Sequence, residues 1–281
     1  MKKDIRLIAV DMDGTLLNSQ GMVSQRNLAA IGAAQRAGVV FSICTGRFFE
    51  NASIFALDQR LHCPLITLNG GKGADGPFGR VLYRHLMPQS VAMNAFEVLE
   101  NMDTSYFAFG EGRVSIRKHG DLHHSQVEYG TRMQREAHTE YVYGKSASID
   151  LIEQGIYKYY VSVGPDQKLH QAMWERLAQV PGLSVTQSSE TNIELMPCGV
   201  DKEQGVREMA ASLSIGMEHV MAIGDQGNDL PMIRAAGWGV AMGNATTLVK
   251  RHADAVTDHH DEDGVARAIE LYVLGRSSGQ A

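Results

Sequence analysis

Residues 5–15, with the sequence IRLIAVDMDGT, decide the fold because an apolar run stops abruptly at two carboxylates. The run Ile5–Val10 predicts a short buried strand, and Asp11 and Asp13 follow where that strand ends. Ligands bind at the carboxyl ends of the strands in open α/β sheets. Gly14 would let the chain turn tightly behind the acidic pair. The stretch therefore predicts a polar site at the edge of an α/β sheet.

Strand and helix signals alternate through the segment that follows. Helices are expected at about 25–37 and 47–60, and the apolar runs at 39–44 and 64–68 predict two more buried strands. Continuous apolar strands separated by helices favour a parallel sheet that is covered on both faces. The glycine-rich stretch 69–79 predicts a turn or a hairpin.

The pattern changes between about residues 83 and 189. Residues 106–109 and 113–117 flank a Gly-Glu-Gly turn and predict a β-hairpin, and the aromatic run 156–163 predicts another strand. A helix is expected at 166–179. This block predicts an α+β unit that differs from the segment before it.

The earlier alternation returns after this block, with a helix expected at 201–213 and a strand at 219–223. We therefore expect an α/β protein with a Rossmann-like parallel-sheet core, formed by residues 1–84 and 190–281. The α+β block, residues 85–189, would be a cap domain inserted into that core.

Composition narrows the class of protein. The 281 residues carry 26 lysines and arginines against 32 acidic residues, so the net charge of −6 disfavours nucleic acid and anionic membranes as partners. No apolar run approaches the roughly 18 residues of a membrane span, and no signal peptide is evident, so a cytoplasmic protein is expected. Cys44, Cys63 and Cys198 match no disulfide or zinc pattern and are expected to be buried thiols.

The acidic pair Asp11 and Asp13 calls for a cation. Two carboxylates this close repel each other, and one would be pushed toward its neutral form without a positive partner. Mg²⁺ suits such a site because it takes carboxylate and carbonyl oxygens and keeps several waters. A calcium loop of the EF-hand type would need further ligands that the sequence lacks. A magnesium site is thus favoured over a plain turn.

Three further motifs follow predicted strands or begin helices. Thr45 and Gly46 end the second strand and could hold an anion at a helix N-terminus, although an ordinary helix cap explains them better in isolation. Lys202 lies in a first helical turn, where a cation is unfavourable. A phosphate or a carboxylate cluster would explain it, and a solvated lysine explains it as well. The stretch 224–229, GDQGND, adds the polar residues Asp225, Asn228 and Asp229.

The four pieces DMDGT, TGR, DK and GDQGND, in this order, resemble the four motifs of the haloacid dehalogenase superfamily. The run 224–245 and the NGG at 69–71 are most similar to its Cof-type phosphatases, which include sugar-phosphate phosphatases. The resemblance covers both core segments and is weak across the middle. It implies a Rossmann-like core with a large cap inserted after the third core strand.

The resemblance also implies chemical roles. Asp11 would attack phosphorus and form an aspartyl-phosphate, and Asp13 would act as general acid and then general base. Mg²⁺ would bind the side chains of Asp11 and Asp225 and the backbone carbonyl of Asp13. The remaining matching residues would hold phosphoryl oxygens or bridge them to the nucleophile; they are Thr45, the amide of Gly46, Lys202 and Asn228, with Asp229 orienting Lys202 or a metal-bound water.

The expected function is a Mg²⁺-dependent phosphatase acting on small phosphorylated metabolites such as sugar phosphates or pyridoxal phosphate. A phosphomutase or phosphotransferase shares the aspartyl-phosphate step and remains an alternative. A non-catalytic ligand-binding regulator is disfavoured because it would not need Asp13. Glu203 departs from the glycine that often follows the motif lysine, and would weaken phosphate binding if it pointed inward.

Weaker signals have ordinary explanations. The pairs His123-His124 and His259-His260, the second followed by Asp261, resemble metal ligands, but adjacent residues rarely chelate one ion, so solvated or capping loops are favoured. Aromatic and basic residues of the middle segment could line a substrate pocket, although residue by residue the cap's own sheet is the favoured interpretation; they are Tyr106, Phe107, Arg113, Arg117, Lys118, Tyr141, Tyr143 and Lys158.

Overall fold

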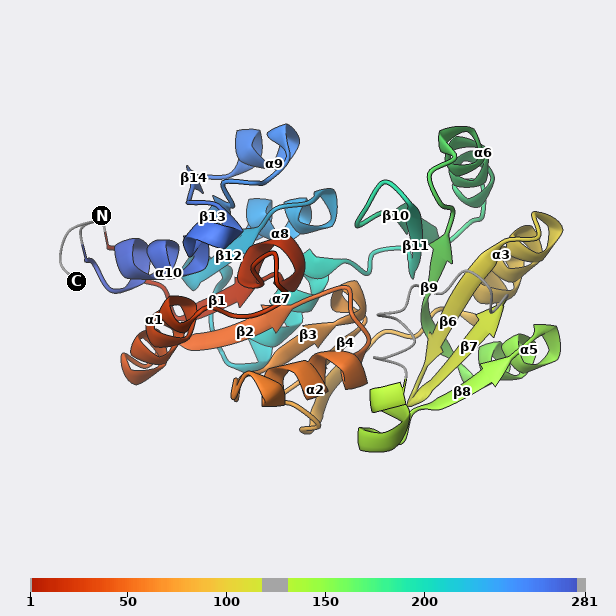
Figure 1. Ribbon diagram of the computed structural model, residues 1–281, viewed down its shortest axis with the longest axis horizontal. Helices are drawn as coiled ribbons and strands as arrows, with labels where there is room; N and C mark the ends of the chain where they lie inside the picture. Colours follow the sequence, from red (N-terminus) through yellow and green to blue (C-terminus); the bar gives the residue numbers. More distant parts are fainter. Residues whose placement is uncertain (1, 118–130, 277–281) are drawn as a thin grey trace.

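The computed structural model describes residues 2–117 and 131–276 and forms two sheets that lie side by side along its long axis (Figure 1). The first is an eight-stranded sheet with the order β14-β13-β12-β1-β2-β3-β4-β5. The second is a six-stranded sheet with the order β10-β11-β9-β6-β7-β8. The predicted α/β class, with a parallel-sheet core and a second α+β unit, is confirmed.

The core sheet is built around β1 (Leu7–Val10), which pairs in parallel with β2 on one side and β12 on the other. All four residues of β1 are buried, as expected for a strand covered on both faces. The other core strands are β2 (Val40–Cys44), β3 (Leu65–Thr67), β4 (Lys72–Ala74), β5 (Val81–Arg84), β12 (Val220–Gly224), β13 (Trp238–Ala241) and β14 (Ala255–Val256).

The helices of the core connect these strands. The first begins where predicted, because the Ser24 hydroxyl accepts a hydrogen bond from the Asn27 amide, 3.0 Å away, and caps it. The core helices are α1 (Gln25–Arg36), α2 (Phe49–Asp58), α7 (Lys202–Ser212), α8 (Leu230–Ala235), α9 (Thr247–His252) and α10 (Gly264–Ala268).

One edge of the core sheet is antiparallel. The glycine-rich stretch after β3 forms the predicted hairpin, so β4 runs antiparallel to β3, and β5 antiparallel to β4. A connection of only a few residues cannot make the crossover that parallel pairing needs. All strands of the second sheet follow β5 in the chain.

The second sheet has helices against one face and an open face that turns toward the core. The helices α3 (Gln89–Asn101), α5 (Lys145–Gln154) and α6 (Gln167–Leu177) enclose an apolar cluster with the sheet. The strands of this sheet are β6 (Ser105–Gly110), β7 (Arg113–Arg117), β8 (Glu140–Tyr143), β9 (Ile156–Ser162), β10 (Leu183–Thr186) and β11 (Asn192–Pro197).

The sheet to which strand β11 belongs decides where the inserted unit ends. It pairs antiparallel with β9 and β10, so residues 192–197 belong to the second sheet. The sequence placed them at the start of the second core segment. We propose a cap that begins after Arg84 and extends to Pro197, with the core resuming before α7.

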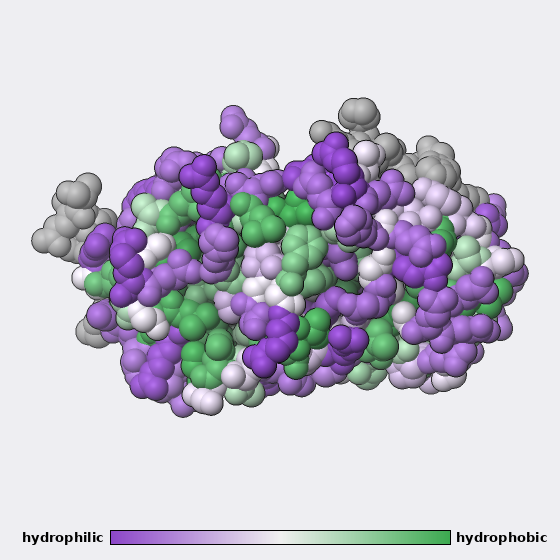
Figure 2. All heavy atoms as spheres, turned by 90° about the horizontal axis from the view of Figure 1, so that it is seen from below, coloured by the Kyte–Doolittle hydropathy of each residue, from purple (hydrophilic) through white to green (hydrophobic). Residues whose placement is uncertain are grey.

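Three further features complete the description of the fold. On the face in Figure 2, hydrophobic residues are scattered among hydrophilic ones, which is ordinary for a folded protein surface. Of the helices in the described part of the chain, none is both long and apolar enough to cross a membrane. Cys44 and Cys63 are buried as expected, but Cys198 is exposed because it lies in the turn directly after β11.

Candidate active site

A cavity of about 580 Å³ lies between the carboxyl ends of the core strands and the open face of the cap sheet. Five of the predicted site residues line it, namely Asp11, Asp13, Thr45, Gly46 and Asn228. The other three, Lys202, Asp225 and Asp229, are buried close to Asp11. The structure thus brings all eight predicted residues together, from four separate stretches of sequence.

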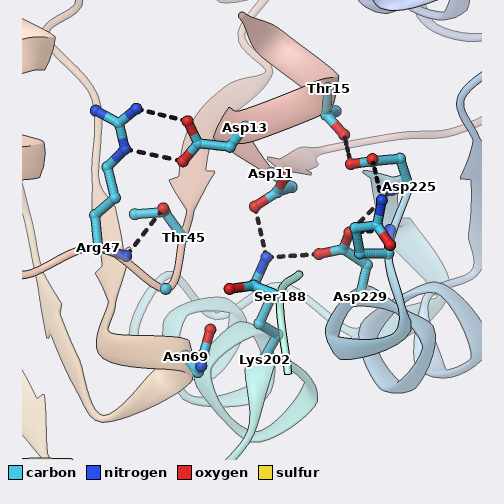
Figure 3. Close-up of polar contacts among 12 residues, drawn as sticks. Asp11, Asp13, Thr15, Thr45, Arg47, Asn69, Ser188, Lys202, Asp225 and Asp229 are labelled. Atoms are coloured by element: carbon cyan, nitrogen blue, oxygen red, sulfur yellow. Dashed lines mark hydrogen bonds and ion pairs between the residues drawn. The ribbon is translucent and has the colours of Figure 1, made fainter. Parts of the chain in front are cut away.

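Lys202 links two of the carboxylates (Figure 3). Its Nζ donates hydrogen bonds to Asp11 Oδ1 at 2.5 Å and to Asp229 Oδ1 at 2.6 Å. The lysine is 1% exposed, so its charge is compensated by these two partners and not by water. The alternative of a solvated lysine is therefore wrong.

The balance of charges sets the proton affinity of this cluster. Burial alone would lower the pKa of Lys202, but the carboxylates of Asp11 and Asp229 outweigh it and hold that pKa well above its usual value. Burial and the nearby charge of Asp229 raise the pKa of Asp11, although Lys202 opposes them. The cluster carries more negative than positive charge and would gain from a further cation.

Asp225 directly follows β12 and lies close to both Asp11 and Asp229. Its Oδ1 accepts a hydrogen bond from the Thr15 hydroxyl at 2.8 Å. Gly14, with φ of 80°, leaves room for this carboxylate, since a Cβ there would lie 2.6 Å from Asp225 Oδ2. Burial, together with the charge of Asp229, raises the pKa of Asp225 to about 6.

The donor set fits a magnesium ion. Carboxylate oxygens of Asp11, Asp225 and Asp229 all lie within 4.8 Å of one another. Asp229 is already engaged, because Lys202 bonds its Oδ1 and the backbone amides of Asp225 and Gln226 donate to its Oδ2, both at 2.9 Å. Asp225 is also bonded, by the Thr15 hydroxyl and the Gln226 side-chain amide, but these donors are neutral. All three side chains offer hard oxygen donors, which Mg²⁺ prefers.

Asp13 and the Thr45–Arg47 turn form the opposite wall. Arg47 donates from Nε and Nη2 to the two carboxylate oxygens of Asp13, at 2.9 and 2.5 Å. The Arg47 amide also donates to Thr45 Oγ1 at 3.2 Å. Figure 3 shows Asp13 directed to Arg47, while Asp11 points to Lys202. The two aspartates of the motif are therefore held apart by two different cations.

A buried contact between the two sheets was not predicted. Lys158, in β9, donates from Nζ to the carbonyl oxygen of Gly46 at 2.8 Å and pairs with Glu194 of β11 at 3.3 Å. Glu194 also accepts hydrogen bonds from Asn69 Nδ2 and from the Ser188 hydroxyl. Burial lowers the pKa of Lys158, and the attraction of Glu194 offsets this only in part. A lysine inside the aromatic run 156–163 was the available signal.

Asn244 is a second residue that the sequence reasoning missed. Its Nδ2 donates to the Gly14 carbonyl oxygen at 2.7 Å and lies 3.4 Å from Asp225 Oδ2. It thereby supports both the turn behind Asp13 and the Asp225 carboxylate. Asn244 follows the apolar strand β13, so the same strand-end rule that selected Asp11 could have found it.

Of the weaker candidates, the pair His259-His260 and Glu203 lie in the described part of the chain. His259 caps a helical turn by accepting from the Asp261 amide, as the capping interpretation predicts, and the Asp261 side chain bonds Ser19. Side-chain donor atoms of His259, His260 and Asp261 nevertheless lie within 4.8 Å of one another, as the ligands of a metal ion would. Glu203 pairs with Arg207 at 2.8 Å, one turn along α7. His123, His124 and Lys118 lie outside the described residues.

The aromatic and basic residues of the middle segment divide between two environments. Tyr106 packs in the apolar cluster of the cap, and Arg113 and Arg117 form ion pairs with Glu140 and Glu100. The pocket interpretation applies to the remaining four, which line the cavity: Phe107, Tyr141, Tyr143 and Lys158.

Comparison with known proteins agrees with this geometry. A family model described as haloacid dehalogenase-like hydrolase matches residues 8–269. The 5-amino-6-(5-phospho-D-ribitylamino)uracil phosphatase YcsE of Bacillus subtilis is 33% identical over 96% of this chain and 97% of its own. Phosphatase YwpJ of the same organism is 32% identical over 95% of this chain and 99% of its own.

The solved structures agree as well. A haloacid dehalogenase-like hydrolase from B. subtilis superimposes with a TM-score of 0.80 at 29% identity, over 95% of this chain and 99% of that one. The family that the four motifs predicted is confirmed over nearly the whole chain. The chain belongs to the haloacid dehalogenase-like hydrolases.

Proposed function

We propose that this chain is a Mg²⁺-dependent phosphatase that hydrolyses small phosphorylated metabolites through an aspartyl-phosphate on Asp11. The observation that carries the proposal is the position of Asp11, which lies in the cavity wall while Lys202 holds one of its oxygens. A carboxylate can attack an anionic phosphate only where nearby cations offset the repulsion between them.

The residues around Asp11 would share the work of holding the phosphoryl group. Thr45 and the Gly46 amide, on one side of the cavity, and Asn228, on the other, would bind its oxygens. Lys202 would stabilise the charge that develops as the phosphorus–oxygen bond breaks. Asp229, fixed by two backbone amides, would keep the ammonium group of Lys202 in place.

Asp13 would protonate the leaving oxygen and then take a proton from the hydrolytic water. Its side chain is 59% exposed and pairs with Arg47. An ion pair this exposed is weak, so Asp13 can turn from Arg47 toward the leaving oxygen.

The metal would be held by the side chains of Asp11 and Asp225 and by the backbone carbonyl of Asp13. Bound there, Mg²⁺ would supply positive charge that offsets the repulsion between Asp11 and the phosphate. The raised pKa values of Asp11 and Asp225 support this assignment, because a cation bound between them would favour the ionised form of both carboxyls.

Phosphate release tests the proposal directly. Wild type and Asp11→Asn would be assayed on sugar phosphates, nucleotides and pyridoxal phosphate, with Mg²⁺ and with EDTA. We expect release that needs Mg²⁺ and disappears in Asp11→Asn, while the circular dichroism of the variant stays that of the wild type.

Two results would contradict the proposal. Undiminished phosphate release in EDTA would show that the reaction needs no Mg²⁺. Activity retained by Asp11→Asn would show that Asp11 is not the nucleophile. Conversion of one sugar phosphate into its isomer, without release of phosphate, would favour the phosphomutase instead.

A further inference from the structure

The open face of the cap sheet is aromatic where it borders the cavity. In β6 the side chains alternate, so Tyr106 and Ala108 are buried against the cap helices while Phe107 and Phe109 point to the opposite face. A sheet face that water covers is normally polar. Phe107 and Phe109 are instead half-buried rings in the wall of the cavity that contains Asp11.

The rings form a continuous surface. Phe107 and Phe109 lie nearly parallel, at 17°, with centroids 6.2 Å apart. Tyr160 meets Phe107 edge-on at 6.1 Å, and Phe48 of the core lies 5.3 Å from Phe109. Phe109 therefore also joins the cap to the core, whereas Phe107 packs against the cap rings of Phe109 and Tyr160. Phe107 is the ring that is best placed to meet a substrate.

The charged residues of the cavity wall offer no excess positive charge to a second anionic group on the substrate. Among the described lining residues, the carboxylates of Asp11, Asp13 and Glu194 face two cations, Arg47 and Lys158. Arg47 is bonded to Asp13, and Lys158 is bonded to Glu194. These five residues together carry no excess of positive charge, even when Asp13 turns from Arg47, so the described wall suits a leaving group without further phosphates.

We propose that the preferred substrate is a phosphate monoester whose leaving group carries a flat, uncharged aromatic or heteroaromatic ring that lies against Phe107. This inference rests on the proposed phosphatase activity and narrows it. A flat ring gains from stacked or edge-on contact with aromatic side chains beyond the area it buries. The volume of about 580 Å³ is in the range of pockets that enclose whole small molecules, so such a ring fits beside the phosphate.

The test compares two probes that differ mainly in the ring. Benzyl phosphate and cyclohexylmethyl phosphate have similar size and both leave as primary alcohols, but only the first ring is flat. We expect kcat/KM to be about tenfold higher for benzyl phosphate, through a lower KM, because aromatic contacts contribute on this scale. Glucose 6-phosphate serves as a polar, non-aromatic reference.

Phe107→Leu keeps an apolar side chain but removes the ring. It should reduce the preference for benzyl over cyclohexylmethyl phosphate to about twofold and leave glucose 6-phosphate nearly unchanged. Tyr160→Leu, which removes the lining ring that meets Phe107 edge-on, provides a second variant if the first does not fold. Phe78→Leu, an exposed ring outside the cavity lining, is the matched control and should keep the full preference.

The outcomes separate the two proposals. Equal kcat/KM for the two probes in the wild type, or an equal loss on all three substrates in folded Phe107→Leu, overturns the ring proposal while phosphatase activity stands. No Mg²⁺-dependent release from any substrate, the three probes and acetyl phosphate included, overturns the proposed function and the ring proposal with it.

Discussion

Two buried lysines mark the two sides of the cavity and differ in how their charge is held. Lys202 of the core and Lys158 of the cap are 1% and 2% exposed. Lys202 has two carboxylate partners, and these raise its pKa against the effect of burial. Lys158 has one carboxylate partner, Glu194, and burial lowers its pKa.

The difference in their partners indicates different roles for the two lysines. A cation with two carboxylate partners is a fixed charge, which suits a group that must meet a phosphate. Lys158 instead donates one hydrogen bond to the carbonyl of Gly46, in the core turn between β2 and α2. Its contact exists only while the cap lies against the core, so it belongs to the closed arrangement of the two units more than to the chemistry.

The largest expected effect is that of Lys202→Met. Loss of the ammonium group should lower kcat by about 10² to 10³, the usual effect of removing one stabiliser of developing charge. It also leaves Asp11 and Asp229 facing each other in a buried site, which should cost roughly 3–5 kcal/mol in the free energy of unfolding. Steady-state kinetics and urea denaturation measure the two effects.

Lys168→Met is the control for this change, because Lys168 is exposed on α6 and does not line the cavity. It should leave kcat and the free energy of unfolding at wild-type values. If Lys202→Met retained wild-type kcat, the contrast between a catalytic and a closing lysine would not hold.

The same contrast explains what the sequence could predict. Asp11 and Asp225 each follow an apolar strand, so local patterns located them, and parallel pairing of β1 and β12 brings them together. Lys158 and Gly46 lie 112 residues apart and meet only through the orientation of the cap. No local pattern encodes that orientation.

Glu194 is another residue whose position could not be predicted from the local sequence. Its stretch was expected to begin the second core segment, because the strand–helix alternation resumes close to it in the sequence. Pairing with β9 and β10 places β11 in the cap sheet instead. The partners of a strand depend on residues far away in the sequence. An apolar run therefore predicts a strand, but it does not indicate to which sheet the strand belongs.

Glu50, like the two lysines, is a buried ionisable group, but it has no strong partner for its charge. It lies in α2, is 7% exposed, and burial raises its pKa to about 7 although Lys72 opposes the shift. The folded protein therefore holds this proton more tightly than the unfolded chain. The resulting stability is complete below about pH 4.5 and is lost as the pH rises through about 7.

Glu50→Gln should remove this pH dependence, because the amide stays neutral. We expect the variant to equal the wild type in unfolding free energy at about pH 4.5 and to exceed it at about pH 8, by at most roughly 3 kcal/mol. Urea denaturation at both pH values measures the difference. An unchanged difference at the two pH values would mean that Glu50 ionises freely in the folded protein.

The smallest expected effect concerns the cap lysine itself. Replacing a buried ion pair by uncharged groups of similar size is often neutral, so Lys158→Met combined with Glu194→Gln should change the free energy of unfolding by only about 1 kcal/mol. Loss of the bond to Gly46 should loosen the closed cap and lower kcat/KM about tenfold, mainly through KM. Kinetics beside Lys202→Met separate the two lysines, because Lys202 should act on kcat. If the cap variant lost kcat as severely as Lys202→Met, Lys158 would have to be placed in the chemistry, and the two sides of the cavity would be alike.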